Sequence, residues 1–215
     1  MSDAQPQGFL ASPPSTTNKG VLVMHAWWGL NDTLKAYCTK LSQAGYTAFA
    51  PDLYHGQVTD TIVGAEALSS ALFGRLEQAR QDAAAAARYL YQLCGEPAQG
   101  LAEIGFSLGA FMALDLSINQ PQLIHKVVTY YGAHPGAFGT SQAAYLAHIA
   151  ETDEYEPQEG MDEMQAALEK AGRPAAFYQY QGTGHWFAEA DRSAYDAQAA
   201  NLAWERTLAF LNETP

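Results

Sequence analysis

The 215-residue sequence contains only two cysteines, Cys38 and Cys94, and no C-x-x-C pair. Two cysteines cannot form the framework of a small disulfide-rich secreted protein, so both are predicted to be small buried residues of helices. Residues 1–7 contain neither a positively charged side chain nor an apolar stretch, and a secretory signal requires both. We therefore expect a reduced, cytoplasmic protein.

Basic residues and long apolar runs are also scarce. Lys and Arg number 11 against 23 Asp and Glu, which gives a formal net charge of −12. Because nucleic acids and anionic membranes bind basic patches, neither is an expected partner. No apolar run approaches the roughly 20 residues that cross a membrane. No pair of His, Cys or carboxylate residues has metal-ligand spacing, so we expect no metal and no other cofactor.

Apolar residues, by contrast, make up 48% of the chain, which is enough for a large core. The length suits one domain over residues 1–215, with residues 1–8 predicted to be flexible. Short apolar segments alternate with segments of helical spacing. The expected strands cover residues 9–11, 21–24, 46–50, 101–106, 127–131, 145–150 and 175–180, and the expected helices cover 31–44, 64–93 with a break near residue 74, 108–119, 159–171 and 192–211.

This alternation of apolar strands and helices predicts an α/β fold with a mostly parallel central sheet and helices on both faces. Proteins with such sheets carry their sites at the C-terminal ends of the strands. Four chemically notable segments follow expected strands, namely residues 25–29 and those containing Ser107, Asp153 and His185.

The most informative of these segments runs from Gly105 through Ser107 to Gly109 and reads G-x-S-x-G. In this pattern the serine lies on a strained turn between a strand and a helix, which exposes its hydroxyl as a nucleophile. Glycines two positions away on either side avoid a collision with the tight turn. The alternative is an ordinary small-residue turn. The surrounding strand and helix favour the nucleophile.

A serine nucleophile requires a histidine base, and the histidine requires a carboxylate that orients it. In this type of fold the partners follow in the order Ser, Asp or Glu, His. Asp153 and His185 come in that order, each in a loop after a strand. Glu151 and Glu154 are the alternative carboxylates, and a solvated loop is the alternative role of all three.

Two backbone N–H groups are expected to stabilise the oxyanion, those of Trp27 and Leu108. Residues expected near the substrate lie in the loops at the strand ends, where ordinary core packing or surface exposure is the alternative. They are Trp28, Tyr54, His134, Trp186 and Phe187.

The sequence resembles the dienelactone hydrolase family of α/β-hydrolases over nearly its whole length from about residue 9. The matching segments are VLVMHAWWGLN at 21–31, YTAFAPDLY at 46–54, EIGFSLG at 103–109, the D-x-x-x-P step at 153–157 and G-x-G-H-x-F at 182–187. The resemblance implies a compact sheet without a large lid and hydrolysis of small esters or lactones. It also implies Ser107, Asp153 and His185 as the catalytic triad.

Three positions depart from the family pattern. Many members have Cys at the elbow, where this chain has Ser107, and dienelactone hydrolases proper have Glu where this chain has Ala26. Those enzymes also use arginines to hold the substrate carboxylate, one of them just after the catalytic histidine. Glu189 occupies that neighbourhood here, and the nearest arginine is Arg192. Because a serine depends on a histidine base rather than on thiolate formation, the loss of Cys and Glu together favours ordinary ester hydrolysis.

We therefore predict a serine hydrolase that cleaves small carboxylic esters or lactones through an acyl-enzyme, as a monomer or homodimer. Acyl transfer or thioester cleavage on the same triad is the first alternative. A non-catalytic binding protein is the second, because fold alone does not establish activity.

Overall fold

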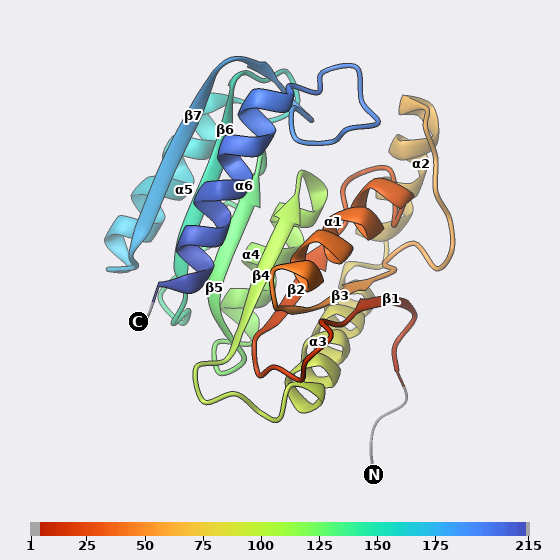
Figure 1. The fold of residues 1–215 in the computed structure, drawn as a ribbon. Coiled ribbons are helices and arrows are strands. Elements are labelled where there is room, and N and C mark those ends of the chain that lie inside the picture. Colours follow the sequence, from red (N-terminus) through yellow and green to blue (C-terminus); the bar gives the residue numbers. More distant parts are fainter. Residues whose placement is uncertain (1–4, 214–215) are drawn as a thin grey trace.

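The computed structural model describes residues 5–213 and contains a seven-stranded sheet flanked by helices (Figure 1). The strand order is β1-β3-β2-β4-β5-β6-β7, and only β1 is antiparallel to its neighbour. The strands are β1 (Gly8–Ala11), β2 (Gly20–Met24), β3 (Thr47–Pro51), β4 (Leu101–Phe106), β5 (Ile124–Tyr130), β6 (Ala144–Thr152) and β7 (Ala175–Gly184). The predicted α/β fold with a mostly parallel sheet is confirmed.

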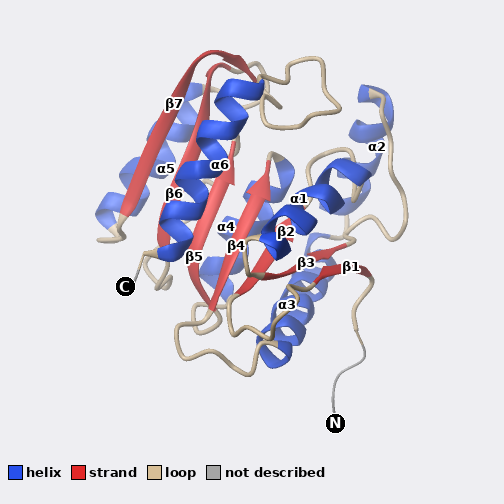
Figure 2. Ribbon diagram, viewed as in Figure 1, coloured by secondary structure: helices blue, strands red, loops and turns tan. Residues whose placement is uncertain are grey.

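Helices cover both faces of the sheet, as Figure 2 shows. They are α1 (Asp32–Gln43), α2 (Ile62–Phe73), α3 (Leu76–Leu93), α4 (Leu108–Asn119), α5 (Gln158–Lys170) and α6 (Ala197–Asn212). Buried residues of α1 and α6 pack on one face, and those of α3, α4 and α5 pack on the other. Because two helical layers bury the sheet, β2 and β3 are buried along their whole length. Among the elements of residues 5–213, no large lid covers the C-terminal ends of the strands.

Local signals explain some of the element boundaries. The side chain of Asn31 accepts a hydrogen bond from the Leu34 amide at 3.1 Å and begins α1, as the sequence predicts. The predicted break near Gly74 separates α2 from α3.

Cys38 and Cys94 are buried free thiols. Within residues 5–213, no helix combines the length and apolar character that a membrane crossing requires.

Three predicted boundaries are wrong by three residues or more. Strand β7 continues to Gly184 instead of ending at Tyr180, because an irregularity in the β6–β7 pairing lets Thr152 pair with Gly184. Helix α6 begins at Ala197 rather than at residue 192, because the Asp196 side chain accepts from the Ala199 amide at 2.8 Å. Strand β5 begins three residues earlier than predicted, at Ile124.

The predicted flexible segment is partly ordered. Gly8 belongs to β1, and the Asp52 amide donates a hydrogen bond to the Gln7 carbonyl at 3.0 Å. Residues 1–4 lie outside the described residues. The N-terminal segment therefore adds an edge strand beside β3.

Candidate active site

Ser107 lies between β4 and α4 with φ 53° and ψ −117°, a conformation that L-residues rarely adopt. Its amide donates to the Tyr130 carbonyl at 2.9 Å, and its carbonyl accepts from the Ala110 amide at 2.7 Å. These bonds hold the strained residue between the sheet and the first turn of α4. The side chain is left partly exposed at the C-terminal edge of the sheet.

The two glycines of the motif are required by close backbone contacts. A Cβ atom at Gly105 would lie 2.3 Å from the Gly109 carbonyl oxygen, and one at Gly109 would lie 2.3 Å from the Met24 carbonyl oxygen. These glycines allow α4 to approach both its own strand and the end of β2. The loop after β2 is thereby brought next to Ser107, where the strand order reverses.

A chain of short hydrogen bonds joins the three predicted site residues. Ser107 Oγ lies 2.8 Å from His185 Nε2, and His185 Nδ1 lies 2.6 Å from Asp153 Oδ2. The side chains of His185 and Asp153 are only 4% and 7% exposed, which protects their contact from water. The three residues come from the ends of β4, β6 and β7, so the fold brings together groups far apart in the sequence.

Backbone amides fix the Asp153 carboxylate. Its second oxygen, Oδ1, accepts from the amides of Tyr155 at 2.9 Å and Glu156 at 2.8 Å. The alternative carboxylates do not take this place. Glu151 accepts from the Gly182 amide at 2.7 Å, and Glu154 is exposed. One oxygen of Asp153 is therefore anchored to the loop while the other faces His185.

The two predicted oxyanion donors lie at the start of a helix and in a tight turn. Leu108 is the first residue of α4, where helix N–H groups lack a partner within the helix. Trp27 is the first central residue of a turn closed by a 3.2 Å bond from the Gly29 amide to the Ala26 carbonyl. Below this turn, buried His25 accepts from the Leu53 amide at 3.2 Å and bonds the Ala26 carbonyl at 2.8 Å, which stiffens the loop.

Aromatic side chains surround His185. The rings of Trp27, Trp28, Trp186 and Tyr155 form a closed series of contacts, which we call the aromatic cluster. Tyr155 and Trp186 also contact the His185 ring, with centroids 5.2 and 4.9 Å away. Tyr155 was not among the predicted site residues, because its direction depends on the turn that follows Asp153.

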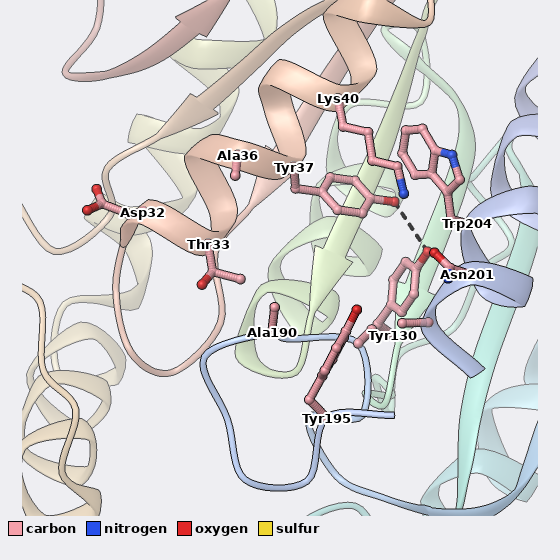
Figure 3. A pocket seen from close by; sticks show the side chains of 12 residues that line it. Asp32, Thr33, Ala36, Tyr37, Lys40, Tyr130, Ala190, Tyr195, Asn201 and Trp204 are labelled. Carbon is pink, nitrogen blue, oxygen red and sulfur yellow. Dashed lines mark hydrogen bonds between the residues drawn. The ribbon is translucent and has the colours of Figure 1, made fainter. Parts of the chain in front are cut away.

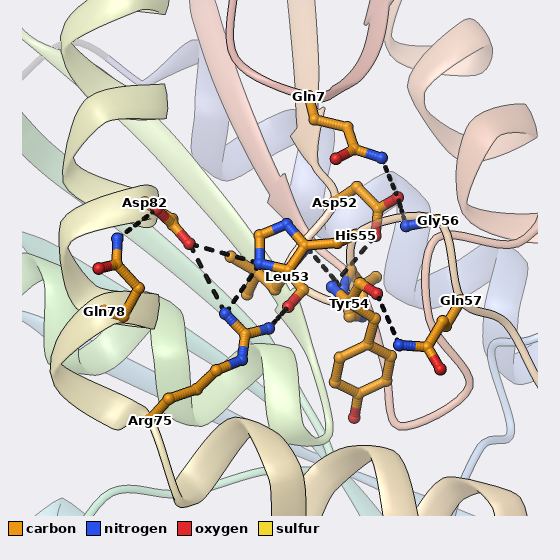
Figure 4. A network of polar contacts seen from close by, with 11 residues as sticks. Gln7, Asp52, Leu53, Tyr54, His55, Gly56, Gln57, Arg75, Gln78 and Asp82 are labelled. Carbon is orange, nitrogen blue, oxygen red and sulfur yellow. Dashed lines mark hydrogen bonds and ion pairs between the residues drawn. The ribbon is translucent and has the colours of Figure 1, made fainter.

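Three residues predicted to contact the substrate pack against other parts of the protein. Phe187 is fully buried against Tyr131 and Tyr180, so no face of its ring is open to a ligand. Tyr54 is 2% exposed and packs on the His25 ring at 4.7 Å. The polar network in Figure 4 holds its loop, where the Arg75 guanidinium donates to the Leu53 carbonyl at 2.6 Å.

His134, the third of these residues, joins an ionic cluster with Asp115 and Arg80 on α4 and α3. Its Nε2 lies 3.4 Å from Asp115 Oδ1, and Arg80 donates to both Asp115 oxygens at 2.7 and 3.0 Å. Burial alone would raise the pKa of Asp115, but the hydrogen bonds from His134 and Arg80 outweigh it and lower the pKa to about 2. This geometry gives His134 a structural partner.

Acid should weaken the cluster in a defined range. Because the pKa of Asp115 is lower in the folded than in the unfolded state, its stabilising effect is present above about pH 4 and is lost as the pH falls to about 2. We expect Asp115→Asn to lower the free energy of unfolding by about 1 kcal/mol at pH 7 and by little at pH 2. Urea unfolding at both pH values measures this, and an equal loss at both would contradict it.

Glu189 is a buried carboxyl group behind the site. Its side chain is 1% exposed, and Oε1 accepts from the Tyr131 hydroxyl at 2.8 Å. The Tyr131 ring in turn lies 4.9 Å from the His185 ring. Burial raises the pKa of Glu189 to about 8, so the group is mostly uncharged at neutral pH. Glu189, which lies in the neighbourhood where the family resemblance implied an arginine, therefore points into the protein.

A groove of about 420 Å³ opens elsewhere, between α1, α6 and the loop at 188–195 (Figure 3). It is lined by Tyr37, Lys40, Tyr195 and Trp204 among others, and not by Ser107 or its partners. No group of three His, Cys, Asp or Glu side chains in residues 5–213 comes together in a way that could hold a metal ion.

Comparison with known proteins gives a consistent result. Protein usf of Aquifex pyrophilus is 28% identical and covers 96% of this chain and 93% of its own length. A probable 2-oxo-3-(5-oxofuran-2-ylidene)propanoate lactonase of Bradyrhizobium sp is 28% identical, over 94% of this chain and 87% of its own. A dienelactone hydrolase-like promiscuous phosphotriesterase from metagenomic libraries matches the fold with a TM-score of 0.82 at 21% identity, over 92% and 87% of the two chains.

A family model gives the assignment directly, because it spans almost the whole molecule. The model described as the dienelactone hydrolase family matches residues 7–214. The chain therefore belongs to the dienelactone hydrolase family.

Proposed function

We propose that this protein is a serine hydrolase that cleaves small carboxylic esters or lactones through an acyl-enzyme. The observation that carries the proposal is the hydrogen-bonded chain from Ser107 Oγ to His185 at 2.8 Å and from His185 to Asp153 at 2.6 Å. This arrangement has the order and contacts of a catalytic triad. Family membership supports the same reaction class.

In the first step His185 Nε2 takes the hydroxyl proton as Ser107 Oγ attacks the carbonyl carbon. The Asp153 carboxylate stabilises the imidazolium and holds the His185 ring so that the second ring proton stays on Nδ1. The negative charge forms on the carbonyl oxygen, where the N–H groups of Leu108 and Trp27 receive it. The strained turn and the N-terminus of α4 hold these donors in place before the charge appears.

The tetrahedral intermediate then collapses. His185 gives its proton to the departing alcohol oxygen, and the acyl group remains as an ester on Ser107. Water enters, His185 takes its proton, and the hydroxide attacks the acyl carbon. Release of the carboxylic acid returns the proton to Ser107, so the enzyme ends as it began.

Labelling with a fluorophosphonate tests the nucleophile directly. The reagent phosphonylates serines that an adjacent base activates, with loss of fluoride. We expect one adduct per chain, located on Ser107 by mass spectrometry of peptides, and none after treatment in denaturant. An adduct on a different residue, or an unlabelled Ser107 in the folded protein, would overturn the proposal.

A further inference from the structure

The aromatic cluster defined above, Trp27, Trp28, Trp186 and Tyr155, lies beside the histidine that protonates the leaving alcohol in the proposed mechanism. Tyr155 is 38% exposed, and Trp27 and Trp186 are partly exposed, while Trp28 is buried beneath them. The cluster thus presents apolar ring faces and edges to the place where the alcohol part of an ester leaves.

The geometry of the cluster is that of a platform rather than a cage. Neighbouring ring centroids lie 4.7–6.1 Å apart at angles of 42–62°, which is direct ring-to-ring contact. The rings therefore fill the space between themselves and leave no room among them for a quaternary ammonium group. In addition, the Arg192 guanidinium already lies 4.3 Å from the centroid of Trp28.

Charge around the platform disfavours anionic groups. The segments at the C-terminal ends of β2, β4, β5, β6 and β7, which are residues 25–30, 107–111, 131–137, 151–157 and 184–191, contain no Lys or Arg. Besides the buried Glu189 they contain five Asp and Glu residues, among them Asp153 and Glu154. Arg192 is paired with Asp191 at 2.7 Å, with a side chain only 14% exposed. A carboxylate on the substrate would therefore meet negative charge without a free cation.

We propose that the preferred substrates are uncharged esters whose alcohol part carries an aromatic ring, which stacks on Tyr155 and Trp186. This inference rests on the proposed function, since it concerns the substrate of the same Ser107 site. It sets the protein apart from the Bradyrhizobium relative, whose name describes a lactone with a propanoate group.

Four acetate esters test the preference, because their alcohols differ in shape or charge with little change at the reacting oxygen. They are benzyl, cyclohexylmethyl, 4-carboxybenzyl and 4-(trimethylammonio)benzyl acetate. We expect kcat/KM for benzyl acetate to exceed that for the cyclohexylmethyl ester about fivefold, in line with stacking of about 1 kcal/mol. We expect kcat/KM for benzyl acetate to exceed kcat/KM for the carboxylated ester by at least about tenfold. For the cationic ester, kcat/KM should be no higher than for benzyl acetate.

Matched variants assign the preference to the platform. Tyr155→Leu should reduce the benzyl to cyclohexylmethyl ratio to about one, and Tyr155→Phe, which keeps the ring, should retain it. Tyr178 is an equally exposed tyrosine, also 38%, on the sheet edge strand β7. Tyr178→Leu should therefore leave the ratio unchanged. The ratio is informative even if a variant lowers overall activity, because both esters react at the same serine.

The outcomes separate this inference from the proposed function. If p-nitrophenyl acetate is hydrolysed at Ser107 but the carboxylated or cationic ester is preferred, the inference is overturned and the function stands. The same holds if Tyr155→Leu keeps the benzyl preference. If no ester is hydrolysed and Ser107 takes no label, the function fails and the inference fails with it.

Discussion

Ser107→Ala should lower the rate of p-nitrophenyl acetate hydrolysis by at least about a thousandfold while the protein stays folded. In the proposed mechanism the variant lacks the oxygen that attacks the carbonyl, and loss of a nucleophile typically removes most of the catalytic effect of a triad. The remaining rate would come from the oxyanion donors alone. Initial rates measured at saturating ester, with circular dichroism to confirm the fold, check the prediction.

Ser70→Ala, a change at an exposed serine of α2, is the matched control and should leave the rate unchanged. A Ser107→Ala protein that hydrolyses the ester at the wild-type rate would remove Ser107 from the mechanism. Ser107→Gly extends the test to the backbone. Because glycine adopts φ 53° without strain, the free energy of unfolding of the Ser107→Gly variant should be about 1 kcal/mol higher than that of the Ser107→Ala variant.

Glu189→Gln should stabilise the protein at pH 8 by about 3 kcal/mol more than it does at pH 5. The pKa of Glu189 is about 8 in the folded protein, against about 4.5 when the chain is unfolded. The unfolded chain therefore loses this proton first, and the folded state loses stability as the pH rises from about 4.5 to about 8. Glutamine does not ionise and retains an oxygen that accepts from the Tyr131 hydroxyl.

Chemical unfolding of both proteins at pH 5, 6.5 and 8 measures the difference. Glu163→Gln, at an exposed position of α5, is the control and should change stability by less than about 0.5 kcal/mol at every pH. A Glu189→Gln protein whose stability follows the same pH dependence as the wild type would show that Glu189 is ionised in the fold. The result also matters for the site, because Tyr131 lies between Glu189 and His185.

Much of the architecture was accessible from the order of residue types. Strand β2 is recognisable because a parallel sheet buries both faces, so the hydrophobic residues 21–24 run continuously. The G-x-S-x-G pattern located the elbow because only glycine fits at Gly105 and Gly109, where a Cβ atom would collide with backbone. The ends of β7 and α6 were misplaced, since pairing irregularities and caps compete with apolar periodicity.

By itself, the sequence determined the fold class, the family resemblance and the positions of Ser107 and His185, because backbone sterics and topological order require particular residues at particular places. The tertiary structure decided which carboxylate faces His185, since the bonds to Asp153 Oδ1 come from amides of its own loop. It also decided the directions of Tyr155, Phe187 and Glu189. Whether such side chains reach a ligand or the core depends on contacts between distant segments, which local pattern does not encode.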